Sequence, residues 1–143
     1  MSDEVKRAGL LLRVFAKVLD FILIAVVTEI VPKAGFYAGL AYLLISDGLF
    51  DGRSIGKLLI GLRVVSTNGN EPCSMRESIT RNATFGAGLL LYKIPWIGWF
   101  FLVVISAVEF LILLGSKNGM RFGDEFAGTL VIEKVRHVVR QEG

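Results

Sequence analysis

Three charged residues lie at helical spacing inside a long apolar segment near the start of the chain. Asp20 stands about half-way along residues 10–31, with Lys17 three residues and Arg13 seven residues before it. These spacings place the three side chains on one stripe of a helix. A charge near the centre of a bilayer costs about 2.5 kcal/mol or more, so such a stripe must face protein, an internal partner or a water-filled cavity. The stripe is therefore the first place to look for ion or proton chemistry.

A second acid is expected to be buried in the last apolar segment. Glu109 lies six residues from the inner end of that segment, at a depth similar to that of Lys17. Asp47, near the inner end of the second segment, is placed to accept a hydrogen bond from Arg13. Lys17 also has the right spacing to pair with Asp20 along one helix.

Three interpretations of these charges stay open. In the first, Asp20 and Glu109 exchange a proton or a cation in a polar pocket. Lys17 and Arg13 then set the affinity of the two acids. In the second, the charges form fixed ion pairs between helices that hold the packing and transport no ion or proton. In the third, they line an interface between copies of the chain.

The composition is that of a small integral membrane protein. The chain has 143 residues, of which 53% are hydrophobic, and a mean hydropathy of +0.60. Charged residues interrupt the first apolar segment, so it lacks the pattern of a cleaved signal peptide and is expected to stay in the mature chain. The net charge of +3 is expected to report membrane topology, and nucleic acid is not expected as a partner.

Residues suited to catalysis or metal binding are few. Cys73 is the single cysteine and His137 the single histidine, so neither an intramolecular disulfide nor a familiar zinc site is expected. No nucleophile can be matched with a histidine and an acid at similar depth. We therefore expect neither an enzyme nor a protein with a metal or another cofactor.

Four apolar segments and the placement of basic residues predict an all-α membrane protein built from two transmembrane hairpins. The second and third segments are short for a bilayer, although a capping box of Ser74 and Glu77 extends the third back to residue 75. A partial insertion of the second hairpin, or a single crossing by residues 79–114, therefore stays open. Of the 16 lysines and arginines, only Lys33 and Lys93 fall on the side opposite both termini. The positive-inside rule therefore places both termini in the cytoplasm. The segments are residues 10–31, 34–50, 79–92 and 95–114.

A glycine-rich motif follows each hairpin and repeats at an offset of 67 residues. Residues 51–65 align with residues 118–132, which fits either an internal duplication or a chance match of common glycines. Each copy predicts a short interfacial helix ended by a glycine and then a strand, and the strands are expected to pair as a small cytoplasmic β-ribbon. The strands are residues 62–66 and 129–133, and the matched glycines are Gly56 with Gly123 and Gly61 with Gly128.

The whole chain, residues 1–143, is expected to form one membrane domain. Its expected parts are a first hairpin at 9–50, a glycine-rich motif and turn at 51–74, a second hairpin at 75–115, and a second motif with a tail at 116–143.

The cytoplasmic motifs carry charges with a structural or a lipid-binding role. Asp124 follows a glycine on a short segment, where a carboxylate is able to cap a helix or hold a basic residue of the other motif. The motif glycines are assigned to turn and cap geometry. Because four short helices enclose little volume, a homo-oligomer or a membrane protein partner is expected. A basic face for anionic lipid head groups, or for topology alone, is expected from Arg53, Lys57, Arg63, Arg76 and Arg81.

Several motifs occur in a fixed order over roughly residues 6–134: Arg13 and Asp20, then the run 56–65, the pair Arg81 and Asn82, and the run 123–131. In this order they resemble the RDD family, which is named after one arginine and two aspartates. The resemblance assigns these three positions to Arg13, Asp20 and Asp124.

The resemblance implies a bacterial inner-membrane protein that transports an unidentified ligand. Some similar proteins exchange sodium for protons, whereas a eukaryotic relative is an interaction module in a ubiquitin-ligase complex. Lys17 departs from the family pattern, and this extra cation weakens a cation site at Asp20. We therefore expect transport of an ion or small solute, with cation/proton exchange as one form of it. The alternative is a non-catalytic membrane module that assembles with a larger complex.

Overall fold

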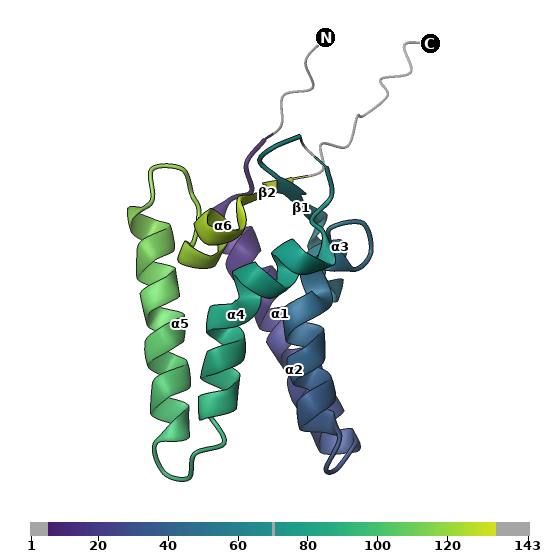
Figure 1. Cartoon of the computed structure of the whole chain (residues 1–143), viewed down its shortest axis with the longest axis vertical. Helices are drawn as coiled ribbons and strands as arrows, with labels where there is room; N and C mark the ends of the chain where they lie inside the picture. Colours follow the sequence, from purple (N-terminus) through teal and green to yellow (C-terminus); the bar gives the residue numbers. More distant parts are fainter. Residues whose placement is uncertain (1–5, 70, 134–143) are drawn as a thin grey trace.

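Two helical hairpins stand side by side, and a cap of two strands and two short helices joins them at one end (Figure 1). The computed structural model describes residues 6–69 and 71–133, so His137 and the basic tail lie outside the described residues. The elements are α1 (Leu10–Ile30), α2 (Gly35–Ile45), the 3-10 turn η1 (Ser46–Gly48), α3 (Ile55–Ile60), β1 (Leu62–Ser66), α4 (Met75–Leu91), α5 (Gly98–Gly115), α6 (Phe122–Ala127) and β2 (Thr129–Glu133).

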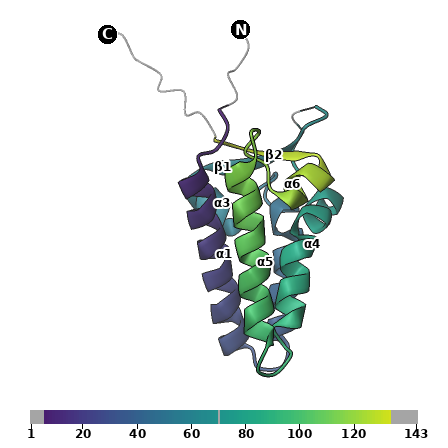
Figure 2. The same ribbon diagram turned by 90° about the vertical axis from the view of Figure 1, so that its left-hand side faces the viewer.

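The loops that close the two hairpins lie at the end opposite the strands (Figure 2). At that end the ammonium of Lys93 lies 4.3 Å from the ring centre of Phe36 and 4.8 Å from that of Tyr37. These cation–π contacts connect the second hairpin with the start of α2. Both described ends of the chain lie in the cap, where the Glu133 amide donates to the Lys6 carbonyl at 2.9 Å.

Local signals in the sequence explain where the elements begin and end. The Ser74 hydroxyl accepts from the Glu77 amide, and the Glu77 carboxylate accepts from the Ser74 amide, so the predicted capping box starts α4 at Met75. Gly61 and Gly128 end α3 and α6 with φ of +83° and +62°. This left-handed conformation favours glycine, and each glycine leads directly into a strand.

The chain is built from two copies of one structural unit. Helices α3 and α6, and strands β1 and β2, follow each other at the offset of 67 residues that the repeat predicted. The strands are antiparallel, and Val64 pairs with Val131, the residue that matches it in the repeat. Pairing centred on matched residues is what a two-fold axis produces. The axis passes between these two valines.

The two-fold relation is broken among the long helices. Helix α1 packs on α3 as α4 packs on α6, and α2 packs along α4. Helix α5, which is related to α2, does not pack along α1 in the same way. The side of the molecule between α1 and α5 is therefore less filled than the side between α2 and α4.

Two small clusters of buried apolar side chains lie on this framework. One joins α1 to the strands and contains Ala16, Leu62, Val64, Cys73 and Val131. The other lies between α1, α2 and α4 and contains Ile24, Leu43, Phe85 and Leu89. The first cluster fixes the cap on the hairpins, and the second closes the bundle below it.

Within the described residues, α5 is the one helix long and apolar enough to cross a membrane. Its 18 residues span about 27 Å at the rise of an α-helix. The charges of α1 remove it from this class. Helix α2, with 11 residues, is shorter than the predicted segment, because the chain turns at η1 and then takes positive φ at Phe50 and Asp51.

Candidate functional site

Asp20 anchors the start of α3 to α1. Its carboxylate accepts from the Tyr42 hydroxyl at 2.8 Å, the Ser54 hydroxyl at 2.6 Å and the Gly56 amide at 2.9 Å, and the residue is 1% exposed. These donors are all neutral. The expected pairing with Lys17 is wrong, because no ion pair joins the two residues and the N-terminus of α3 occupies both oxygens of Asp20.

Gly56 and Gly123 allow the short helices to touch the long ones. A Cβ atom on Gly56 would lie 2.1 Å from the Ala16 carbonyl oxygen, and one on Gly123 would lie 2.1 Å from the Arg81 carbonyl oxygen. Both distances are far below van der Waals contact. The matched glycines therefore perform the same packing role in the two repeats.

Asp124 joins α1, α4 and α6 through three arginines. It forms ion pairs with Arg13, with Arg81 at 2.7 Å and with Arg121 at 3.3 Å. The Arg121 amide also donates to it, and Arg13 donates in addition to the Gly119 carbonyl. Burial alone would raise the pKa of the Asp124 carboxyl, but the arginines outweigh burial and hold the pKa well below its ordinary value. Asp124 is therefore an ionised clamp.

Asp47 forms a second buried centre beside the first. It pairs with Lys57 and with Arg81 at 3.3 Å, and it accepts from the Asn82 amide at 3.1 Å. The expected contact with Arg13 is wrong, since Arg13 turns to Asp124. Arg81 lies between the two aspartates, but its N–H groups are not aligned for hydrogen bonds. The bridge is held by charge and proximity.

Lys17 has no carboxylate partner among the described residues. Its ammonium donates to the Asn82 side-chain carbonyl at 3.2 Å. It lies 5.2 Å from the ring centre of Phe85 and 5.9 Å from that of Phe21. Glu109 is 4% exposed on α5 and forms no ion pair with Lys17. Equal depth does not bring these two side chains together.

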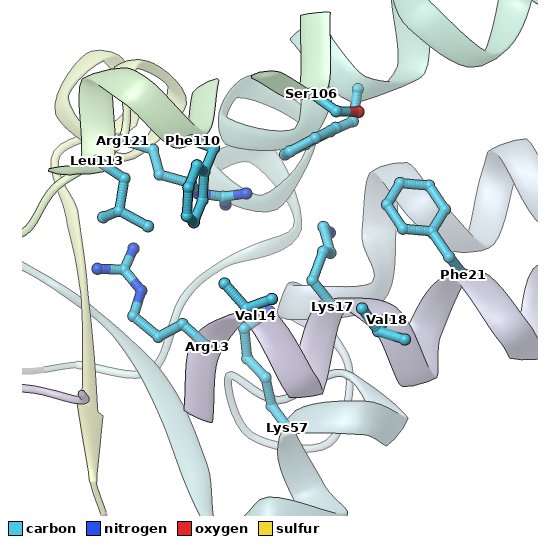
Figure 3. A pocket seen from close by; sticks show the side chains of 11 residues that line it. Arg13, Val14, Lys17, Val18, Phe21, Lys57, Ser106, Phe110, Leu113 and Arg121 are labelled. Carbon is cyan, nitrogen blue, oxygen red and sulfur yellow. The ribbon is translucent and has the colours of Figure 1, made fainter. Parts of the chain in front are cut away.

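A pocket of about 180 Å³ lies between α1, α4 and α5, on the less filled side of the molecule. Figure 3 shows Arg13 and Lys17 extending from α1 toward Arg121 and Phe110 on the opposite wall. We call it the cationic pocket, since none of the described residues that line it is an acid. It is lined by Arg13, Val14, Lys17, Val18, Phe21, Lys57, Phe85, Ser106, Phe110, Leu113 and Arg121.

The structure also corrects the expected basic face. Lys57 is 4% exposed and Arg81 is 1% exposed, so both belong to the interior. Arg63 pairs with Asp51 at 2.6 Å, and Arg53 lies 3.8 Å from the same carboxylate. Lys57 and Arg81 therefore drop out of the expected face, whereas Arg76 is exposed.

Several side chains of the site did not stand out in the sequence as partners. The hydroxyls of Tyr42 and Ser54 hold Asp20, and Asn82 holds Lys17. Ser54 precedes a short apolar run and is a recognisable helix N-cap, so the sequence indicated where α3 begins. The free amides of such a helix start need an acceptor, which here is the carboxylate of Asp20. Arg121 matches Ser54 at the offset of 67 and is the N-cap residue of α6, so the repeat pointed to it.

The fold and the site define a mostly helical protein with a membrane-capable helix and a cap that holds buried charge centres. The model of the RDD family matches residues 34–128, about two thirds of the chain, and the protein belongs to this family. The match begins after α1 and ends at residue 128, so it includes Asp124 and all four matched glycines but neither β2 nor Arg13 or Asp20. Neither a curated protein nor a solved structure matches the chain.

Proposed function

We propose that the protein lies in a bacterial inner membrane with α1, α2, α4 and α5 in the bilayer and the cap in the cytoplasm. The family and the apolar helix α5 support a membrane location. The basic residues gather at the cap, and both described chain ends lie there. At the other end Tyr92, Trp96 and Trp99 are 52%, 95% and 60% exposed, as expected for an interfacial aromatic belt.

Cysteine labelling tests this topology. Cys73 is 3% exposed, and burial raises the pKa of its thiol to about 12, so the native cysteine is expected to stay unlabelled in the folded protein. In spheroplasts an impermeant maleimide should label Lys93→Cys directly and Asn68→Cys only after permeabilisation. The opposite order of labelling would contradict the proposed orientation.

Within this topology we propose transport of an ion or small solute through the cationic pocket. The observation that carries the proposal is a charged pocket between α1 and α5, where a lysine has no carboxylate partner in the described part of the chain. Ionisable residues at membrane depth are costly, and they commonly mark substrate or ion paths. The pocket provides both the space and the charge for a solute.

Cation/proton exchange on Asp20 and Glu109 is the less favoured form of this function. The oxygens of Asp20 already accept from three donors, and neither acid lines the pocket. A cation would have to displace the N-terminus of α3 to reach Asp20. The cations of the pocket favour an anionic solute instead.

Proteoliposomes test transport. Vesicles receive an inward gradient of sodium, chloride or octanesulfonate, and a potential-sensitive dye together with an internal pH-sensitive dye follows the flux, so that electroneutral exchange is also detected. We expect at least one ion to cross faster than in protein-free vesicles, and Lys17→Met to slow this flux about tenfold. Since Lys17 lacks a carboxylate partner, this variant is expected to fold, and Lys117→Met on the exposed cap loop is the matched control. Rates equal to those of protein-free vesicles for all three ions would contradict transport.

A membrane assembly module is the second candidate. In its favour, the carboxylates of Asp20, Asp47 and Asp124 all have partners within the chain, which describes a rigid scaffold. Folded, correctly oriented protein that moves none of the three ions would favour this candidate. It would then act through a second copy or another membrane protein.

A further inference from the structure

The cationic pocket has an excess of positive charge. Four buried cations form ion pairs with two carboxylates, those of Asp47 and Asp124, and Lys17 forms no ion pair with the described residues. The charge of Asp20 acts on Lys17 and Lys57 without forming an ion pair, and Glu109 makes no ion pair with the described residues, so Lys17 has no direct counter-charge. Uncompensated charge is costly in a low-dielectric site, and a bound anion would relieve that cost. The cations that line the pocket are Arg13, Lys17, Lys57 and Arg121, and Arg81 pairs with both carboxylates without lining the pocket.

Lys17 supplies unused hydrogen-bond donors to the pocket. An ammonium group has three N–H donors, and one of them is directed to Asn82 at 3.2 Å. The rings of Phe21 and Phe85 attract the charge but do not replace an oxygen acceptor. The guanidinium of Arg121 lies on the opposite wall (Figure 3). Ammonium and guanidinium groups facing one space are suited to an oxyanion.

The rest of the pocket is apolar and opens sideways. Val18 on α1 and Phe110 on α5 line it and are 46% and 41% exposed, so its mouth lies on the outer surface between these helices. In the proposed topology this surface faces the acyl chains of the bilayer. Val14, Phe85 and Leu113 extend the apolar wall inward. A ligand of this pocket therefore needs an alkyl part beside its charged head.

We infer that the cationic pocket binds an amphiphilic oxyanion, a phosphate, sulfonate or carboxylate head joined to an alkyl chain. The head lies between Lys17 and Arg121, and the chain leaves along Val18 and Phe110 toward the bilayer. The inference rests on the proposed function and names its substrate class. An acidic membrane lipid and a soluble amphiphilic anion share this chemistry, and the test separates these two sources.

Calorimetric titration of the full chain in phosphatidylcholine nanodiscs tests the inference, with empty nanodiscs subtracted. The probes are octanesulfonate, methanesulfonate, octyltrimethylammonium and dioctanoyl phosphatidylglycerol. We expect saturable binding of octanesulfonate or of the phosphatidylglycerol, and the tighter of the two identifies the source. Methanesulfonate and octyltrimethylammonium should bind at least tenfold more weakly. If methanesulfonate bound as tightly as octanesulfonate, the alkyl chain of the ligand would contribute nothing, and if octyltrimethylammonium did so, the negative charge would contribute nothing. Either result would overturn the inference.

Two variants locate the binding in the pocket. Lys17→Met should weaken binding of the tighter probe about tenfold, whereas Lys117→Met should leave it unchanged. Ser106→Phe fills the pocket without changing a charge and should also abolish binding, which keeps the test decisive if the lysine variant fails to fold. Equal losses in Lys17→Met and Lys117→Met would indicate surface attraction and overturn the site.

The titration uses no gradient, so its outcome is independent of flux. Binding without flux of any ion removes transport and keeps the amphiphilic oxyanion as the ligand. Sodium flux without binding of either amphiphilic anion keeps transport and overturns the inference.

Discussion

Replacing Asp124 by asparagine is expected to lower the free energy of unfolding by about 3–5 kcal/mol, which is the usual cost of removing one partner of a buried ion pair. The change leaves Arg13, Arg81 and Arg121 without the carboxylate that holds them together. Unfolding by dodecyl sulfate in mixed micelles, followed by circular dichroism, measures the loss. The neighbouring Glu125→Gln is the matched control, since Glu125 is exposed, and should change stability by less than about 0.5 kcal/mol.

The same clamp gives a signature in the pH dependence of stability. The folded pKa of Asp124 lies below its ordinary value, so its contribution is fully present above about pH 4. The contribution is lost as the pH falls from there through the folded pKa. The stability gap between the wild type and Asp124→Asn should therefore be constant from pH 5 to 7 and narrow below pH 4. A gap that stays constant down to pH 2.5 would contradict an ionised clamp.

The replacement Gly56→Ala is expected to cost about 3 kcal/mol, the upper end of the usual range for overpacking. The new methyl group would lie 2.1 Å from the Ala16 carbonyl oxygen, and backbone rather than a flexible side chain blocks it. Helix α3 must then move away from α1, which stretches the hydrogen bond from the Gly56 amide to Asp20. The same micelle titration measures the change.

A matched glycine controls for the general effect of adding a methyl group. Gly115, at the end of α5, has no atom within 4 Å of an added Cβ and does not have positive φ. We expect Gly115→Ala to be neutral within about 0.5 kcal/mol. If Gly56→Ala were as stable as this control, the close approach of α3 to α1 would be wrong.

The elements were predictable because their signals are local. The capping box of Ser74 and Glu77 and the terminal glycines Gly61 and Gly128 each act within a few residues. The strands were found at the predicted residues for the same reason. The predicted second segment was too long, since its apolar letters continue past the point where the backbone turns at Ser46.

The partners of the buried charges were not predictable from spacing. Lys17 has the right spacing to pair with Asp20. The carboxylate instead accepts from the Ser54 hydroxyl and the Gly56 amide, 34 and 36 residues away, because tertiary packing brings the N-terminus of α3 to it. Depth along the helix also does not predict the partner of Glu109, because depth does not determine which way the side chain faces around the helix axis. Which cation meets which acid is decided by packing between elements.

The pairing of Val64 with Val131 has a consequence for how such a chain could assemble from smaller parts. A unit with one hairpin, one short helix and one strand would present a strand edge that is complementary to itself. Two such units would join through the same antiparallel contact, as the subunits of a symmetric homodimer do. The protein thus has the architecture of a dimer whose two protomers are joined in one polypeptide. Only in this fused form are the two helix interfaces between the halves, α2 with α4 and α1 with α5, free to differ.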